Sequence, residues 1–267
     1  MGSIVYPSVG KVISMKTALT IAGSDPTGGA GLQADLKVFR SFNVHGLSVV
    51  STVTAQSTQG VDSLFPVGKD AFEKQLRVLL GDIRPDALKL GMLYGKWTVG
   101  IIGDVAKEFS LRNLVVDPVT VSSSGMSLVE NGTLDSLKDI IFPLSKIITP
   151  NIYEASVLTG VGIENRENME EAARMLKDMG SEVVVITGGH LERIALDLYY
   201  DGEFHSIEGE KLKGEYHGTG CAFSAAVTAL LALGHSPLES VRRAKEFVGS
   251  AIRKASHPGR GMGLLNL

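Results

Sequence analysis

The chain has 267 residues, of which 44% are hydrophobic and 21% are charged, and its formal net charge is −3 at pH 7. This composition is typical of a globular protein and argues against a disordered chain or one built around nucleic-acid phosphates. The single cysteine excludes an internal disulfide framework, and the sequence has no run of about 18 apolar residues that would predict a membrane span.

Residues 1–15 contain no sustained apolar run, so they predict a poorly ordered leader or cloning remnant and not a signal peptide. Residues 16–267 show no linker, repeat or low-complexity tract, which predicts one domain. The simplest location is the cytoplasm. Neither nucleic acid nor a membrane is expected as a partner.

Eight short runs rich in β-branched or apolar residues predict strands, and the first six alternate with helical patterns. The predicted strands are Thr17–Gly23, Leu47–Gln56, Ala87–Leu93, Asn113–Thr120, Lys146–Pro150, Glu182–Gly188, Ala195–Tyr200 and Glu203–Ile207. Such βαβ alternation predicts an α/β fold in which helices cover both faces of a mainly parallel sheet.

The helices between the predicted strands include Gly31–Phe42, Ala71–Leu80 and Met169–Met179, the last two followed by Gly81 and Gly180 as expected stops. The dipeptide Asp201-Gly202 predicts a two-residue turn, and hence an antiparallel hairpin at one edge of the sheet. Two helices are predicted to close the chain, one starting near Cys221 and one running from Pro237 to about Ala255.

Polar or glycine-rich segments follow the first six predicted strands. Since ligands of open α/β sheets bind beyond the carboxyl ends of the strands, these segments predict a site at one rim of the sheet. They are residues 23–31, Gln56, Gly91-Met92, Asp117-Pro118, residues 151–154 and residues 187–190.

The first of these loops, residues 23–31, matches neither the Walker A pattern nor GxGxxG. One interpretation is a flexible strand-to-helix turn. The other is that Gly28, Gly29 and Gly31 let the backbone approach a ligand, to which Asp35 supplies a carboxylate.

Asn151 and Glu154 allow two interpretations because of their i, i+3 spacing. In the first, Asn151 caps a helix and Glu154 returns the bond. In the second, their oxygens hold water around Mg²⁺ at the rim, with Asp117 as a further carboxylate.

The segment from His217 to Cys221 places Gly218 and Gly220 before a helix of small residues, a pattern typical of an anion site at a helix N-terminus. Cys221 would lie in that first turn, where a helix N-terminus can lower the pKa of a thiol and raise its thiolate fraction. The alternative is a small cysteine packed at the start of a helix. No histidine spacing suggests zinc, and His190 and His217 are ligand candidates at the rim.

Taken together, Thr20–Lys37, Thr54–Gln56, Lys89–Met92, Asp117–Val119, Thr149–Ala155 and His217–Cys221 resemble the hydroxymethylpyrimidine/phosphomethylpyrimidine kinases of thiamine biosynthesis. That family belongs to the ribokinase superfamily, and the resemblance runs from about Lys16 to about Lys254. It implies a three-layer αβα sandwich and a homodimer. It also implies ATP- and Mg²⁺-dependent phosphorylation of 4-amino-5-hydroxymethyl-2-methylpyrimidine, and then of its monophosphate. Thr120, Ser123 and Glu215-Tyr216 depart from the usual family residues.

The resemblance also implies roles for individual residues. Gly23, Asp35, Gln56 and Met92 would surround the pyrimidine, with the Gln56 amide facing the aminopyrimidine edge as Gln faces adenine. The nucleotide side would be formed by Asp117, Asn151, Glu154, Thr187 and Gly188, with Asp117 and Glu154 holding Mg²⁺ through water. Catalysis would use Gly218, Gly220 and Cys221, and Cys221 would take the substrate's hydroxyl proton where much of the superfamily has an aspartate.

Three other functions remain open from the sequence. A pyridoxal or pyridoxine kinase of the same superfamily is the nearest alternative, and a non-catalytic pyrimidine or nucleotide sensor is another. A hydrolase that uses Cys221 as a covalent nucleophile would need a partner base, and the sequence identifies none.

Overall fold

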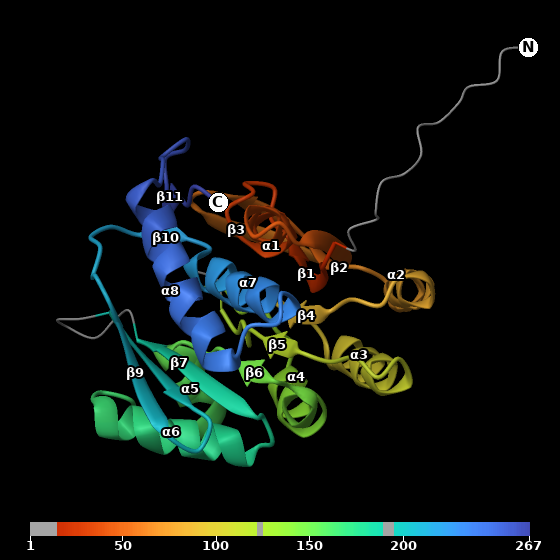
Figure 1. The fold of residues 1–267 in the computed structure, drawn as a ribbon. Coiled ribbons are helices and arrows are strands. Elements are labelled where there is room, and N and C mark those ends of the chain that lie inside the picture. The colour runs from red at the N-terminus through yellow and green to blue at the C-terminus, as the bar shows by residue number, and fades with distance from the viewer. Residues whose placement is uncertain (1–14, 122–124, 189–194) are drawn as a thin grey trace, which may run out of the picture.

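The computed structural model describes residues 15–121, 125–188 and 195–267 (Figure 1). Residues 1–14 lie outside this range, so the leader stays a prediction, and so do the rim positions Gly189 and His190. None of the helices in the described part of the chain has the length and apolar character needed to span a bilayer.

The described strands form one large sheet and a two-stranded ribbon. In the sheet, the order β3-β2-β1-β4-β5-β6-β7-β8-β9 is parallel from β2 to β7 and antiparallel at both edges. The large sheet contains β1 (Thr17–Ser24), β2 (His45–Ser57), β3 (Gly60–Pro66), β4 (Ala87–Leu90), β5 (Leu114–Val116), β6 (Ile147–Ile148), β7 (Val183–Gly188), β8 (Ala195–Tyr200) and β9 (Phe204–Gly209). The ribbon pairs β10 (Tyr216–His217) with β11 (Gly263–Leu264).

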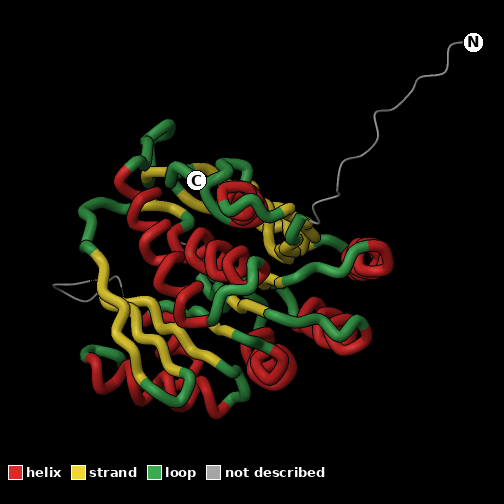
Figure 2. The backbone as a smooth tube through the Cα atoms, in the orientation of Figure 1, coloured by secondary structure: helices red, strands yellow, loops and turns green. Residues whose placement is uncertain are grey.

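Helices cover both faces of the sheet, which confirms the predicted three-layer αβα sandwich (Figures 1 and 2). One layer contains α1 (Gly31–Ser41), α7 (Thr219–Ala232) and α8 (Pro237–Arg253). The other contains α2 (Lys69–Asp82), α3 (Lys96–Glu108), α4 (Thr133–Ser136), η1 (Leu137–Ile141), η2 (Phe142–Leu144), α5 (Ile152–Thr159) and α6 (Arg166–Asp178).

The alternation of side chains along each strand builds a separate core on each face. In β1, Ala18 packs with α7 and α8, whereas Leu19 packs with the opposite layer, and Val115 and Val116 of β5 divide in the same way. Helix α7 is buried along residues 222–232, so it needs apolar residues on all sides. The sheet and α7 therefore form the closely packed base of the rim.

The structure corrects three local predictions. Strand β3 was missed, because Asp62 and Ser63 interrupt its apolar pattern. The hairpin between β8 and β9 is confirmed, but Tyr200 pairs with Phe204, so its loop has three residues and not two. Gly81 does not stop a helix, since α2 continues to Asp82, whereas Gly180, at φ 111°, follows the last residues of α6 as predicted.

Candidate functional site

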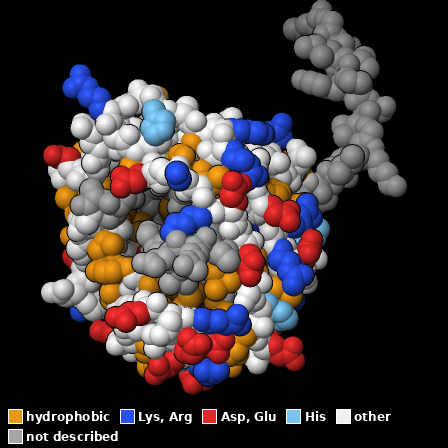
Figure 3. All heavy atoms as spheres, turned by 90° about the vertical axis from the view of Figure 1, so that its left-hand side faces the viewer, with side chains coloured by type: hydrophobic (Ala, Val, Ile, Leu, Met, Phe, Trp, Pro, Cys, Tyr) orange, Lys and Arg blue, Asp and Glu red, His pale blue; other side chains and the backbone are white. Residues whose placement is uncertain are grey.

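A cavity of about 1150 Å³ lies at the carboxyl ends of the parallel strands. It spans the point where β1 and β4 lie side by side, and ligands of open α/β sheets bind at such a switch in strand order. The face toward the left of Figure 1 is hollowed, with Lys or Arg side chains at the hollow (Figure 3). The predicted residues that line the cavity are Gly23, Gln56, Met92, Asp117, Asn151, Glu154, Thr187, Gly218, Gly220 and Cys221.

Asp35 does not line the cavity, which corrects the prediction that it contacts a ligand. Its carboxylate is fully buried, with one oxygen 2.6 Å from Lys89 Nζ and the other accepting a hydrogen bond from Thr20 at 2.6 Å. The side chain that reaches the cavity is Lys89. Asp35 therefore acts through Lys89, as its counter-ion.

Gly188 is also predicted as a cavity residue and does not line it. A Cβ at this position would lie 2.1 Å from the Leu196 carbonyl oxygen, because β7 and β8 pair closely there. Its N–H donates to Asp197 Oδ1 at 3.1 Å, and Asp197 in turn forms an ion pair with Lys245. The preceding residue, Thr187, does line the cavity.

The start of α7 packs directly against the first loop. Gly218 has φ 81°, and a Cβ there would lie 1.8 Å from the Gly29 carbonyl oxygen, so only glycine fits. No side chain caps the helix, and its first N–H groups lie at the cavity wall beside Gly220 and Cys221. The predicted arrangement for an anion is therefore present.

The thiol of Cys221 lies in the first turn of α7, as predicted. Burial and the nearby carboxylates of Asp117 and Asp35 raise its pKa to about 12, although the charge of Lys89 opposes them. A thiol with this raised pKa is neutral at pH 7. His217 bonds to other residues, and no partner base for a covalent nucleophile is found among the described residues.

Lys89 holds a buried positive charge between the acidic groups of this wall. Burial alone would lower its pKa, but the charges of Asp35 and Asp117 raise it above the usual range. It remains an ammonium ion at the base of the cavity, beside Cys221. Sequence reasoning assigned no role to Lys89, although a lysine in the wholly buried strand β4 was a signal.

Asp117 and Glu154 are buried carboxylates whose charges repel each other. Burial raises the pKa of Asp117 despite Lys89 and a hydrogen bond from Ser224, and burial together with Asp117 raises the pKa of Glu154 to about 8. Asn151 and Glu154 also form both bonds of the predicted capping box, at 2.9 Å each. The structural interpretation of this pair is thus confirmed, and the two residues line the cavity as well.

The two carboxylates fit a divalent cation, because the repulsion between them favours a positive charge nearby. No cluster of three or more His, Cys, Asp or Glu suited to a metal occurs in the described ranges. A cation here would thus depend on two protein carboxylates, water and ligand phosphates, which is common for Mg²⁺.

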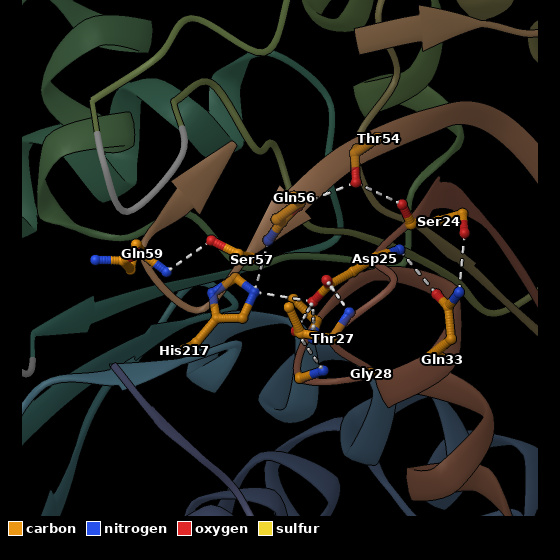
Figure 4. A network of polar contacts seen from close by, with 12 residues as sticks. Ser24, Asp25, Thr27, Gly28, Gln33, Thr54, Gln56, Ser57, Gln59 and His217 are labelled. Carbon is orange, nitrogen blue, oxygen red and sulfur yellow. Dashed lines mark hydrogen bonds and ion pairs between the residues drawn. The ribbon is translucent and has the colours of Figure 1, made fainter. Parts of the chain in front are cut away.

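Gln56 lies at the other end of the cavity, in a hydrogen-bonded group that joins three segments (Figure 4). Its amide lies 2.9 Å from His217 Nε2, and the same ring nitrogen lies 2.9 Å from Asp25 Oδ2. Asp25 further accepts hydrogen bonds from Thr27 and from Ala30 N. Sequence reasoning did not assign Asp25 a role, because its partners are fixed only by the fold.

The family model for phosphomethylpyrimidine kinase matches residues 25–266. The hydroxymethylpyrimidine/phosphomethylpyrimidine kinase of Staphylococcus aureus is 39% identical over 260 residues, covering 96% of this chain and 94% of that protein. The thiamine biosynthesis bifunctional protein ThiED of Geobacter sulfurreducens is 41% identical over 94% of this chain, which spans 52% of that longer protein.

A solved structure gives the same fold. The pyridoxal kinase from Staphylococcus aureus, determined with pyridoxal and with AMP-PCP, superposes with a TM-score of 0.88 at 37% identity. The match covers 95% of this chain and 93% of that one. The predicted resemblance and the ribokinase-like architecture are confirmed.

Proposed function

This chain belongs to the phosphomethylpyrimidine kinase family, and on that premise we propose that it phosphorylates 4-amino-5-hydroxymethyl-2-methylpyrimidine and then its monophosphate, with ATP as donor. It is a small-molecule kinase. The observation that carries the proposal is one continuous cavity with an amide at one end, a helix N-terminus in the middle and two carboxylates at the other. The cytoplasmic location expected from the sequence stays a prediction.

Different residues along the cavity would bind the ring and stabilise the transferred phosphoryl group. Gln56, Gly23 and Met92 bind the ring, and Gln56 suits it because an amide offers a donor and an acceptor side by side. Gly218, Gly220 and the first N–H groups of α7 stabilise the charge of the phosphoryl group during transfer, helped by the ammonium of Lys89.

The nucleotide phosphates would lie toward Asp117, Asn151, Glu154 and Thr187. Asp117 and Glu154 would hold Mg²⁺ through water, and a bound Mg²⁺ supplies positive charge that neutralises the phosphate oxygens. The structure of the relative with AMP-PCP supports the use of ATP by this fold.

Cys221 is proposed as the residue beside the reacting hydroxyl. With its pKa raised to about 12, the thiol is protonated in the free enzyme and cannot act there as a strong base. Phosphoryl transfer through a loose transition state needs little base strength early, so the hydroxyl proton can leave late. For Cys221 to accept the hydroxyl proton, the thiol must first release its own proton to solvent, and the charge of Lys89 favours the thiolate that results.

A direct assay tests the proposal. The purified protein is given ATP, Mg²⁺ and either the hydroxymethylpyrimidine or its monophosphate, and ADP formation is measured. We expect turnover of both pyrimidines. Absence of turnover with both would refute the proposal, and thermal stabilisation by the pyrimidine without ADP formation would instead indicate a sensor.

Pyridoxal is the second candidate substrate, because the pyridoxal kinase from Staphylococcus aureus shares the fold at a TM-score of 0.88. The kcat/KM values for the two rings decide between them. We expect the aminopyrimidine to be preferred, and a strong preference for pyridoxal would reverse the order.

We also propose that the chain forms the homodimer that the family resemblance implies. Val53 of β2 and Phe65 of β3 are direct cross-strand partners on the edge hairpin, and they are 47% and 59% exposed. Such a paired apolar surface at a sheet edge favours contact with a second copy. Light scattering after gel filtration should give a dimer for the wild type and a monomer for Phe65→Lys, and a monomeric wild type would contradict this.

A further inference from the structure

The hydrogen bonds around Gln56 are consistent with only one orientation of its amide. The two ends of an amide have the same shape, so the partners decide which end is nitrogen. Three partners meet here: His217 Nε2 at 2.9 Å from one end of the amide, Thr54 Oγ1 at 3.2 Å from the other, and Asp25 Oδ2 at 2.9 Å from the same His217 nitrogen (Figure 4).

With the amide nitrogen toward His217, two conflicts arise. The ring nitrogen would then accept a hydrogen bond from Gln56 and carry no hydrogen. It would face the carboxylate of Asp25, which can only accept, so two acceptors would lie 2.9 Å apart with no hydrogen between them. Thr54 would have to donate its single hydroxyl hydrogen both to Gln56 and to the Ser24 carbonyl oxygen, which lies 2.8 Å away.

With the amide oxygen toward His217, each close pair contains a donor, and the one shared hydrogen is that of His217 Nε2, which forms a three-centre bond to two acceptors. His217 Nε2–H donates to Asp25 and to the Gln56 oxygen, Gln56 donates its nitrogen hydrogen to Thr54, and Thr54 donates to Ser24. Hydrogen bonds from His217 and Thr27 hold the pKa of Asp25 below its usual range despite burial, so the acceptor is a carboxylate.

The second nitrogen of the histidine supports the same tautomer. His217 Nδ1 is buried and has no hydrogen-bond partner among the described residues. A proton on Nδ1 would leave a buried donor unpaired, whereas a proton on Nε2 has two acceptors within reach. Three observations, at Asp25, at Thr54 and at Nδ1, therefore agree.

We infer that the Asp25–His217 pair is a positioning device that locks the Gln56 amide in one orientation and thereby sets which ring edge the cavity accepts. The lock uses one acceptor site and one donor hydrogen of the amide, and it leaves one of each for a ligand. A ring that offers an acceptor nitrogen beside an amino group pairs with the fixed amide, and a ring of opposite polarity does not. This inference rests on the proposed function for the identity of the ring.

A pair of substrates with opposite edges tests the lock. The first is the 4-amino pyrimidine, and the second is its 4-oxo analogue, whose ring nitrogen carries hydrogen beside a carbonyl oxygen. We expect the wild type to prefer the amino ring by roughly 10- to 100-fold in kcat/KM. In His217→Leu only Thr54 still favours one orientation of the amide, so the preference should fall to a few-fold.

Two variants separate positioning from structural damage. His217→Gln should keep the preference, because its amide nitrogen can donate to Asp25 in place of Nε2. His45→Leu, at an exposed histidine at the start of β2, should change nothing. If His217→Leu lowers kcat/KM for both rings equally and leaves their ratio unchanged, the inference is wrong.

The tautomer of His217 is measured without any variant, by long-range ¹H–¹⁵N NMR of the wild-type protein. A proton on Nε2 supports the inference, and a proton on Nδ1 overturns it. This measurement also keeps the two proposals apart: absence of turnover with both rings refutes the proposed function, whereas the tautomer decides the inference.

Discussion

The polar side chains at the two ends of the cavity interact in opposite ways, by mutual hydrogen bonding at one end and by repulsion at the other. At the amide end, formed by Asp25, Gln56 and His217, the groups bond to one another, and the pKa of Asp25 is lowered. At the acidic end, formed by Asp117 and Glu154, two buried carboxylates repel each other and their pKa values are raised. One end is thus organised before a ligand arrives, whereas the other becomes favourable only when positive charge is added.

Between the two ends lie Lys89 and Cys221, and their state depends on both. Lys89 is paired with Asp35 on its buried side and lines the cavity on the other. This single ammonium is what makes several buried acidic groups tolerable in one wall. The comparison predicts that substitutions in the middle of the cavity and at its acidic end will change the balance of buried charges. Substitutions at the amide end will change the binding of the substrate ring.

The largest expected effect is on stability, from Lys89→Met. Removing the ammonium leaves Asp35 buried without its counter-ion, which should cost about 3–5 kcal/mol of unfolding free energy. Urea denaturation measures this. The control is the double variant Lys89→Met/Asp35→Leu, which should recover part of the loss because both members of the pair are gone. A cost below about 1 kcal/mol for the single variant would contradict the account.

The next effect is on turnover, from Cys221→Ala. We expect kcat to fall about 100-fold with little change in KM, because the thiol acts on the reacting hydroxyl and not on the ring. Steady-state kinetics with the pyrimidine and ATP measure this. Cys221→Ser, which keeps a small polar group, should lose less. An unchanged kcat in Cys221→Ala would remove this residue from the chemistry.

A smaller effect is expected at the amide end, from Gln56→Ala. Loss of the amide should weaken pyrimidine binding by ~1–3 kcal/mol, seen mainly in KM, because a polar ring edge is left without partners. Gln59→Ala is the matched control, since Gln59 is exposed at the turn before β3 and does not line the cavity. Equal KM changes in both variants would show that the Gln56 amide does not bind the pyrimidine ring.

The fold was largely predictable because local patterns carry it. Runs such as Val183–Gly188 are apolar and bounded by polar residues, so they identify strands of a parallel sheet. The edge strand β3 was not predictable in this way, since a strand with one partner tolerates an exposed Asp62 and a half-buried Ser63. The three-residue length of the turn at Asp201 was not predictable either, because the pairing of Tyr200 with Phe204 depends on the whole hairpin.

The sequence predicted which loops form the site, but it did not predict the hydrogen bonds and ion pairs between their side chains. The capping box of Asn151 and Glu154 is local and was visible in the spacing. The contacts between Lys89 and Asp35 and between Gln56 and His217 join positions 54 and 161 residues apart, and no periodic pattern encodes them. For the same reason Asp35 was expected to face the ligand, when the fold turns it toward Lys89.

The last effect, and the one that isolates the acidic end, comes from Glu154→Gln. Folding raises the pKa of Glu154 from 4.5 to about 8, so between these values the folded protein binds more protons than the unfolded chain. Stability contributed by this group is present below pH 4.5 and is lost as the pH rises toward 8. Gln stays neutral and still suits the capping box, so the variant should escape this loss.

We therefore expect Glu154→Gln to match the wild type near pH 4 and to exceed it near pH 8 by at least ~1.4 kcal/mol, the equivalent of one pKa unit. Urea denaturation at the two pH values measures the difference. Glu239→Gln is the control, because Glu239 lies in the first turn of α8 outside the cavity and should show no such trend. A variant less stable than the wild type at pH 8 would mean that the Glu154 carboxylate is stabilised in the free protein, and the contrast between the two ends would fail.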